Sequence, residues 1–300
     1  MGRFFEETFS HRAGSRTYKV HVPRGNRRQS MPLIVMLHGC TQNPDDFAAG
    51  TRMNALSEKH SCVVVYPAQP AAANLAKCWN WFNPDDQQRD HGEPAIIAGI
   101  TQAVMQGYRI DDRQVFIAGL SAGAAMSVIM AATYPELYAA VGAHSGLPYR
   151  SATNMLSGLA AMRNGPAVVE SLSTIGIPII IFHGEDDKTV NPSNSQQLIS
   201  QWLASRQGSA PSSPSSQETG DANGHSFVRT QYRDFQGCLF AEYWRVNNLG
   251  HAWCGGSLEG SYTDANGPDA SEKMLSFFLD QKARRRPGIL SRLMRSIKAH

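Results

Sequence analysis

The residues of this chain best suited to chemistry form a Gly-x-Ser-x-Gly motif at residues 119–123, with Ser121 at its centre. An apolar run, residues 115–118, precedes the motif, and small residues compatible with a helix follow it. This pattern predicts a strand, a sharp turn and a helix, because the glycines let strand and helix approach closely and the turn holds the serine hydroxyl clear of its backbone. We therefore predict that Ser121 is a nucleophile. The alternative is an ordinary glycine-rich turn.

A nucleophilic serine needs a base and an acid that orients the base, and both types follow in the chain. The apolar run 177–182 predicts a buried strand that ends in an acidic turn containing Asp186 and Asp187. Farther on, the run 239–246 predicts another strand, and His251 follows it in a loop marked by glycine. Serine, aspartate and histidine occur in this chain order in α/β-hydrolases.

The elements that must position these residues alternate between strand and helix. Short continuous apolar runs indicate strands that are covered on both faces of a parallel sheet. The sequence therefore predicts the α/β class and the α/β-hydrolase fold, with a mostly parallel central sheet and helices on both faces. We expect an edge hairpin at 4–9 and 18–22, strands at 33–37, 62–67 and 139–145, and helices at 45–60, 93–108, 121–134 and 271–279.

The loop after the strand at 33–37 begins with His38, Gly39 and Cys40. In an α/β-hydrolase this loop supplies one backbone N–H of the oxyanion hole, and the residue after the nucleophile supplies the other. We therefore predict that the N–H groups of Cys40 and Ala122 form the oxyanion hole. The side chain of Cys40 is not needed for that role.

The chain organisation predicts one catalytic domain, residues 1–281, and a basic C-terminal tail, residues 282–300. Residues 147–173 are predicted as a helical, cap-like insertion, and the Ser- and Pro-rich stretch 207–224 as a flexible surface excursion. The tail has apolar residues at helical spacing and no acidic residue. Packing of a solvated helix on the domain is the preferred reading of the tail, and binding to an anionic surface is the alternative.

Composition narrows the possible partners and cofactors. The 300 residues are 42% hydrophobic and carry a formal charge of +3, and nothing in them argues for nucleic acid. We expect no transmembrane segment, because no apolar run reaches membrane length, and the N-terminal residues lack a signal-peptide pattern. No Cys-x-x-Cys or His-x-x-x-His spacing suggests a metal site, so neither a metal nor another cofactor is expected. The oligomeric state is left open.

Several motifs together resemble one family, the esterases of the polyhydroxybutyrate depolymerase type, which are related to feruloyl and acetylxylan esterases. The resemblance covers roughly residues 15 to 280. The motifs that carry it are His38-Gly39-Cys40-Thr41-Gln42, Cys78-Trp79-Asn80-Trp81, Gly119-Leu120-Ser121-Ala122-Gly123, His183-Gly184 with Asp187, and Gly250-His251-Ala252-Trp253.

The resemblance implies a serine carboxylester hydrolase that cleaves hydroxyalkanoate oligomers or polyesters through an acyl-enzyme. It assigns Ser121 as nucleophile, His251 as general base and Asp187 as the orienting acid, since the family spacing His-Gly-x-x-Asp-x-x-Val favours Asp187 over Asp186. His38 and His183 are expected to be structural. We see neither a Thr-rich linker nor a substrate-binding domain after the catalytic part, which the polymer-eroding members usually carry, so activity on crystalline polymer is left open.

The resemblance also concerns the cysteines and tryptophans. Five cysteines leave at least one unpaired, and the family pattern implies a Cys40–Cys78 disulfide. Cys238 and Cys254 flank opposite ends of one predicted strand and are too far apart to bond. Trp79 and Trp81, in the long loop 68–92, and Trp253 are candidate substrate contacts, although packing in the core explains the two loop tryptophans equally well.

Three alternatives to the leading function and location remain. Within the enzymes, the substrate could be a feruloyl or acetyl ester of the plant cell wall. Outside the enzymes, an acyl- or sugar-binding protein on a hydrolase scaffold would fit the aromatic loop, but it predicts a broken triad. The resemblance implies an extracellular or periplasmic location, and a cytoplasmic location is the alternative.

Overall fold

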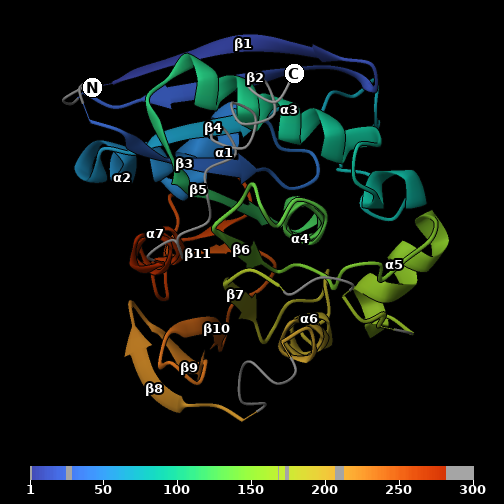
Figure 1. Cartoon of the computed structure of the whole chain (residues 1–300). Coiled ribbons are helices and arrows are strands. Elements are labelled where there is room, and N and C mark those ends of the chain that lie inside the picture. Colours follow the sequence, from blue (N-terminus) through green and yellow to red (C-terminus); the bar gives the residue numbers. More distant parts are fainter. Residues whose placement is uncertain (1, 25–28, 168, 173–175, 207–212, 282–300) are drawn as a thin grey trace.

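The computed structural model describes residues 2–24, 29–167, 169–172, 176–206 and 213–281 (Figure 1). A 10-stranded sheet in the order β1-β2-β4-β3-β5-β6-β7-β10-β9-β8 runs through the molecule. Strands β4, β3, β5, β6, β7 and β10 are parallel, so their carboxyl ends meet at one edge. The bounds are β1 (Arg3–His11), β2 (Gly14–Val22), β3 (Met31–Leu37), β4 (Val63–Pro67), β5 (Ile110–Leu120), β6 (Ala140–His144), β7 (Ile179–Gly184), β8 (Ser216–Ala222), β9 (His225–Arg233) and β10 (Leu239–Val246).

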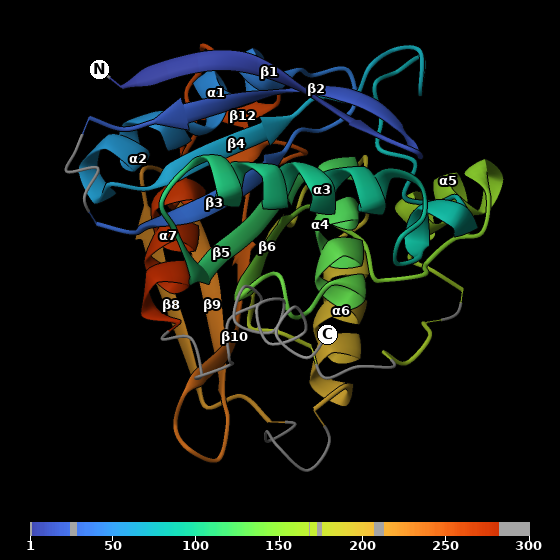
Figure 2. The same ribbon diagram turned by 45° about the horizontal axis from the view of Figure 1, so that its top comes forward.

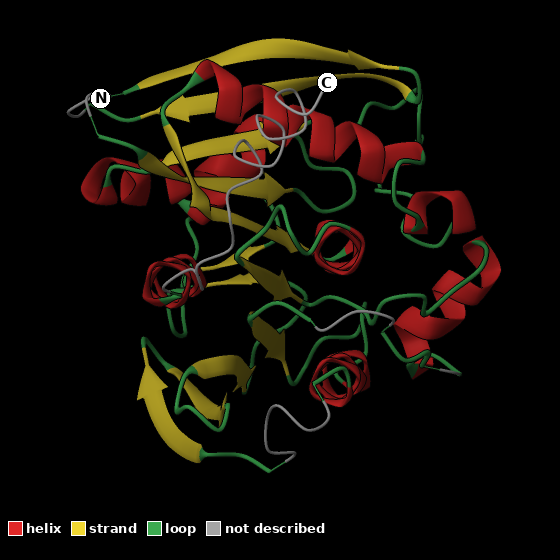
Figure 3. Ribbon diagram, viewed as in Figure 1, coloured by secondary structure: helices red, strands yellow, loops and turns green. Residues whose placement is uncertain are grey.

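Helices cover both faces of this sheet, with α4 and α6 on one side and α2 and α7 on the other (Figures 1 and 3). Alternate side chains of a strand serve the two layers: Ile179 and Ile181 of β7 join one apolar cluster, and Ile180 and Phe182 join the other. All four are fully buried, and each contributes roughly 1.5–3 kcal/mol. The helices are α1 (Pro44–Thr51), α2 (Met53–His60), α3 (Gly92–Gly107), α4 (Ala122–Thr133), α5 (Met155–Asn164), α6 (Ser193–Ala204) and α7 (Ala270–Asp280).

The predicted α/β-hydrolase architecture is confirmed in its main elements. The N-terminal hairpin pairs β1 with β2 and joins β4 antiparallel, and it forms one edge of the sheet (Figure 2). The predicted central strands and the helices α3, α4 and α7 lie within a few residues of their expected positions. This agreement follows from strands whose apolar runs are covered on both faces.

The helix predicted at 45–60 is instead two helices, α1 and α2. Arg52 separates them in the left-handed conformation, with φ 54° and ψ 20°. The guanidinium of Arg52 donates to the Gly255 carbonyl at 2.6 Å and to the Asp269 carboxylate at 2.8 Å. The helix is therefore interrupted at Arg52, where long-range contacts of the side chain accompany an interruption that the local helical pattern does not predict.

Two predicted excursions are more specific in the structure. Within 147–173, helix α5 covers only Met155–Asn164, so most of the other residues that the structure describes in this range are irregular. Within 207–224, the prediction of a flexible excursion is wrong for residues 216–222, which form the edge strand β8 and pair antiparallel with β9. Residues 207–212 lie outside the described residues.

The predicted basic tail, residues 282–300, also lies outside the described residues. In the part of the chain that the structure does describe, no helix has the length and apolar character needed to cross a bilayer. The parallel strands bring their carboxyl ends to one edge of the sheet, and α/β sheets bind their ligands at that edge, so the site is expected there.

Candidate active site

Ser121 occupies a strained turn between β5 and α4. Its φ of 57° and ψ of −119° lie in a region that non-glycine residues rarely adopt. Two features hold it there: its N–H donates to the His144 carbonyl at 2.9 Å, and the neighbouring glycines pack closely. A Cβ on Gly123 would lie 2.1 Å from the Leu37 carbonyl oxygen. This is the geometry of a nucleophile elbow.

Asp187 and His251 come together from the ends of β7 and β10. The His251 Nδ1–H donates to Asp187 Oδ2 at 2.7 Å, which leaves Nε2 of the neutral ring as an acceptor. The other carboxylate oxygen, Oδ1, accepts from the N–H groups of Thr189 and Val190 at 2.9 and 2.8 Å. Asp186, the rival acid, is exposed. The structure thus pairs His251 with Asp187.

The environment of Asp187 keeps it ionised although its side chain is buried. Burial alone would raise the pKa of Asp187, but hydrogen bonding and charge interactions with His183 and His251 outweigh burial and hold the pKa far below its ordinary value. His183 Nε2 donates to the Val190 carbonyl at 2.8 Å, and the Ser195 hydroxyl donates to Nδ1. These contacts assign His183 the structural role that was predicted for it.

His144 connects the serine turn to the segment after the histidine. Its carbonyl accepts from the Ser121 N–H, and its Nε2 accepts from the Cys254 N–H at 3.1 Å. Burial, together with the nearby His183 and His251, lowers the pKa of His144 to about 3, so the ring stays neutral. No sequence pattern points to this residue, because a histidine at the end of a buried strand has no distinctive local signal.

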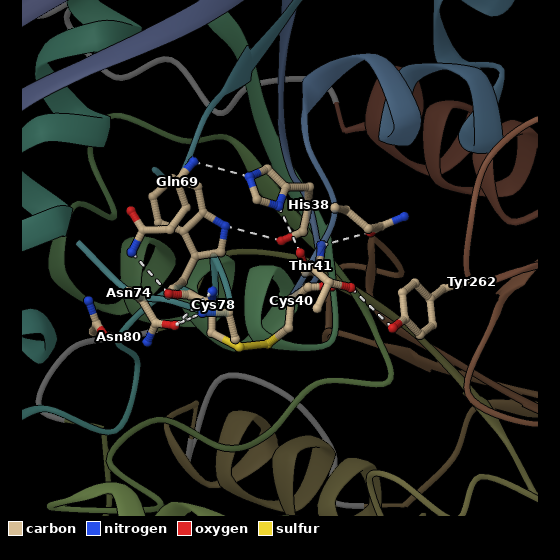
Figure 4. The surroundings of a disulfide bond; sticks show 12 residues. His38, Cys40, Thr41, Gln69, Asn74, Cys78, Asn80 and Tyr262 are labelled. Atoms are coloured by element: carbon tan, nitrogen blue, oxygen red, sulfur yellow. Dashed lines mark hydrogen bonds between the residues drawn. A yellow bond between two sulfur atoms is a disulfide. The ribbon is translucent and has the colours of Figure 1, made fainter. Parts of the chain in front are cut away.

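The loop after β3 is held by a disulfide between Cys40 and Cys78, as the family resemblance implied (Figure 4). The Thr41 N–H donates to the Ala76 carbonyl at 2.6 Å, which ties the same two segments. His38 is buried with a pKa lowered by burial to about 4, and its Nε2 accepts from the Gln69 N–H at 3.1 Å. His38 is therefore structural, as expected.

The two backbone groups predicted for the oxyanion hole are both available. Among the described residues, no acceptor takes the Cys40 N–H, whereas the Gly39 N–H donates to Gln42 Oε1 at 2.9 Å. The Ala122 N–H is at the first turn of α4, where no intrahelical acceptor exists. A Cβ on Gly39 would lie 3.7 Å from the Cβ of Ser121, so this loop adjoins the serine.

A buried polar cluster that the sequence did not reveal supports the Cys78 loop. Glu93, in the first turn of α3, accepts from the Asn80 N–H and side chain, both at 2.8 Å, and from the Gln69 side chain. The same Gln69 side chain donates to the Cys78 carbonyl at 2.9 Å. Burial and the charge of Asp86 raise the pKa of Glu93 to about 7.

The three tryptophans predicted as substrate contacts are all buried. Trp253 has no exposed surface, and its Nε1 donates to the Ser271 hydroxyl at 3.0 Å, so the prediction for this residue is wrong. Trp79 is 1% exposed and donates to the His38 carbonyl, so it is also a packing residue. Trp81 is 5% exposed and its ring lies against that of Phe82, and its contact with a substrate stays a prediction. Aromatic residues near a site often complete the core beneath it.

The remaining cysteines are unpaired: Cys62 and Cys254 are buried and Cys238 is exposed. Within the described ranges, no group of three or more histidine, cysteine, aspartate or glutamate side chains could hold a metal ion.

Comparisons with known proteins find esterases and a depolymerase among the relatives of this chain. The chain is 34% identical over 243 residues to poly(3-hydroxyalkanoate) depolymerase C of Paucimonas lemoignei, covering 77% of this chain and 57% of that protein. It is 28% identical over 201 residues to the probable acetylxylan esterase A of Aspergillus fumigatus, covering 61% and 53%. The chain thus spans little more than half the length of these relatives.

Among solved structures, the acetyl xylan esterase from Aspergillus awamori matches with a TM-score of 0.72 and 21% identity, covering 92% of this chain and 99% of that one. This likeness shows the fold. The family model described as esterase PHB depolymerase matches residues 16–215, which include the loop after β3, the serine turn and the acidic turn. The chain therefore belongs to the esterase PHB depolymerase family of carboxylic ester hydrolases.

Proposed function

We propose that the chain is a serine carboxylester hydrolase with Ser121, His251 and Asp187 as its catalytic triad. The observation that carries the proposal is the 2.7 Å hydrogen bond from His251 Nδ1 to the buried Asp187. It fixes the imidazole tautomer whose Nε2 can accept a proton. The strained turn at Ser121, on the same edge of the sheet, supports the role of nucleophile.

The reaction follows from these roles. His251 Nε2 takes the proton of the Ser121 hydroxyl while Oγ attacks the ester carbonyl carbon, and the carbonyl oxygen becomes an oxyanion. The N–H groups of Cys40 and Ala122 donate to that oxyanion. The C–O bond to the alcohol then breaks, and the alcohol leaves with the proton from His251. Water, deprotonated by the same imidazole, then attacks the acyl carbon, the bond from that carbon to Ser121 Oγ breaks, and Oγ takes the proton back from His251 as the acid leaves.

We assign short hydroxyalkanoate oligomers, or related aliphatic polyesters, as the substrate. The support is the similarity to a poly(3-hydroxyalkanoate) depolymerase, which has the higher identity of the two relatives. Acetyl or feruloyl esters of plant-wall polysaccharides are the second candidate, favoured by the acetylxylan esterases among the relatives and the solved structures. The disulfide supports a location outside the cytoplasm.

The mechanism is tested with Ser121→Ala. We expect hydrolysis of p-nitrophenyl butyrate to fall to background, because the nucleophile is lost, with a nearly unchanged melting temperature. Ser200→Ala, which removes an exposed hydroxyl from α6, is the matched control and should keep full activity. Retained hydrolysis in Ser121→Ala would show that the nucleophile is misassigned.

The substrate is tested by comparing kcat/KM for hydroxybutyrate trimer, methyl ferulate and acetylated xylan with one purified preparation. We expect the trimer to be cleaved with the highest kcat/KM. Cleavage of ferulate or acetyl esters without cleavage of the trimer would reverse the order of the two substrate classes.

A further inference from the structure

Gln42 is a buried residue of the loop after β3, residues 38–43, which is called the oxyanion loop below. The proposed mechanism does not use Gln42. It is 2% exposed and makes hydrogen bonds on both sides of its amide. Oε1 accepts from the Gly39 N–H at 2.9 Å, and Nε2 donates to Asp46 Oδ2 and to the Ser261 carbonyl, both at 2.9 Å. The reverse amide orientation would place an oxygen against the carboxylate and the carbonyl, so these partners determine the orientation.

The Nε2 atom of this amide contacts the segment that follows His251. Ser261 belongs to the segment 255–263, which runs from the end of β11 (Trp253–Cys254) to the first residue of β12 (Thr263–Asp264), and β11 begins just after His251. Asp46 of α1 accepts from the Ser261 N–H at 2.8 Å and from its hydroxyl at 2.6 Å. Gln42 and Asp46 therefore join the oxyanion loop to the segment 255–263.

A second contact joins the oxyanion loop to the segment 255–263 at the surface. The Thr41 and Tyr262 hydroxyls lie 3.1 Å apart, and Figure 4 shows them facing each other beside the disulfide. The segment 255–263 is also anchored to α1, because the Ser257 N–H donates to the Gly50 carbonyl at 2.8 Å. The segment that Gln42 Nε2 contacts is thus itself held by hydrogen bonds to α1 and to Thr41.

We propose that Gln42 is a positioning residue that aims the Cys40 N–H at the developing oxyanion. Its Oε1 engages the Gly39 N–H and leaves the next N–H, that of Cys40, free for the substrate. Its Nε2 holds the loop at a set distance from the segment after His251. This role rests on the proposed function, since it requires an oxyanion to form.

The role has a kinetic signature. Charge develops on the carbonyl oxygen in the transition state, so a misdirected N–H lowers kcat and has little effect on ground-state binding. Loss of an oxyanion donor costs about 100- to 1,000-fold in kcat, and a displaced donor costs less. We therefore expect a kcat reduction of about 10- to 100-fold with KM within about threefold.

The first test is Gln42→Leu, which keeps the side-chain size and removes all of its hydrogen bonds. Steady-state kcat and KM for p-nitrophenyl butyrate are measured well below the melting temperature of each protein. Gln88→Leu, the same change at an exposed residue whose amide bonds only the Pro84 carbonyl, is the control and should keep wild-type kinetics. A melting curve confirms that each variant is folded at the assay temperature.

The second test exchanges the donor and the acceptor of the hydrogen bond between residues 42 and 46. Gln42→Glu keeps an acceptor for the Gly39 N–H but faces the Asp46 carboxylate with a like charge and leaves the Ser261 carbonyl without its donor, so kcat should fall at least tenfold. Adding Asp46→Asn supplies an N–H donor to the new carboxylate, and the double variant should recover at least threefold over Gln42→Glu. A purely structural role for Gln42 predicts no such recovery in kcat.

The outcomes separate this inference from the proposed function. Wild-type protein without esterase activity overturns both. Active wild-type protein with an unchanged kcat in Gln42→Leu, or with the loss confined to KM, overturns the role of Gln42 alone. The same holds if Asp46→Asn gives no recovery in the Gln42→Glu background.

Discussion

Asp187 is a carboxylate that stays charged in a buried position because its partners supply what water would supply. Two backbone N–H groups bind one oxygen and the imidazole of His251 binds the other. Its neighbour Asp186 has the same chemistry but an exposed position. At the scale of single residues, the surroundings therefore distinguish the two acids of the turn.

We predict that Asp187→Asn lowers kcat about 1,000- to 10,000-fold, because an amide facing Nδ1 favours the tautomer whose Nε2 carries the proton. Asp186→Asn is the matched control and should keep kcat within about twofold. Both are measured by hydrolysis of p-nitrophenyl butyrate at pH 8. Equal losses in the two variants would mean that the acid has not been identified.

Glu93 shows the opposite effect of burial on a carboxyl group. Burial and the charge of Asp86 outweigh the hydrogen bonds from Asn80 and Gln69, and the pKa rises from 4.5 to about 7. Between these values the folded state binds more protons than the unfolded state, so stability falls as pH rises through this window. Above about pH 7 the penalty is constant.

We predict that Glu93→Gln removes this pH dependence. Relative to the variant, the wild-type free energy of unfolding should drop by up to about 3 kcal/mol between pH 5 and pH 8. Urea unfolding at intervals of one pH unit measures the difference. Glu259→Gln, at an exposed glutamate, should follow the wild-type curve. Parallel curves for wild type and Glu93→Gln would contradict the assignment.

At the scale of elements, the serine turn depends on how closely β5, α4 and β3 approach. A Cβ on Gly119 would lie 2.4 Å from the Gly123 carbonyl, and a Cβ on Gly123 would lie 2.1 Å from the Leu37 carbonyl oxygen. These neighbours are backbone atoms of buried elements, so they cannot move aside without separating strand from helix.

We predict that Gly123→Ala destabilises the fold by about 3 kcal/mol and strongly lowers esterase activity, because the strand and helix must part. Gly107→Ala is the matched control, since a Cβ at this last residue of α3 meets nothing within 4 Å. It should be neutral or more stable by up to about 1 kcal/mol. Urea unfolding of both variants decides the comparison, and equal stabilities would refute the steric argument.

At the scale of the whole molecule, one sheet separates two apolar layers. Trp79, Trp81 and Trp202 lie in the layer with α3, α4 and α6, and Trp244 and Trp253 lie in the other. Every central strand contributes side chains to both layers, so neither layer can lose its packing while the sheet remains intact. The described part of the chain should therefore unfold as one unit.

We predict one urea transition with the same midpoint by tryptophan fluorescence and by far-ultraviolet circular dichroism. Ile180→Val and Ile181→Val thin opposite layers at adjacent residues, and each should cost about 1 kcal/mol and shift both probes together. Separate midpoints, or a variant that shifts only one probe, would indicate two independently folding domains.

Much of the fold and of the candidate site was predictable from local pattern. The short apolar runs predicted the central strands, because only a strand covered on both faces needs such a run. The glycine-flanked serine predicted its turn, and the acidic turn and the glycine-marked loop predicted the pair Asp187 and His251. Strand β8 was missed because its residues, Ser216–Ala222, include no large apolar side chain and are mostly exposed, so its backbone pairing with β9 is what makes it a strand.

The sequence by itself determined the family, the main architecture and the residues proposed for chemistry, because each depends on a residue type at a local spacing. Only the tertiary structure decided which side chains are buried and which polar groups meet. It placed Trp253 in the core and joined Gln42 to Ser261, 219 positions away. Burial and long-range hydrogen bonds depend on how elements far apart in the sequence pack together, and a pattern of neighbouring residues does not encode that packing.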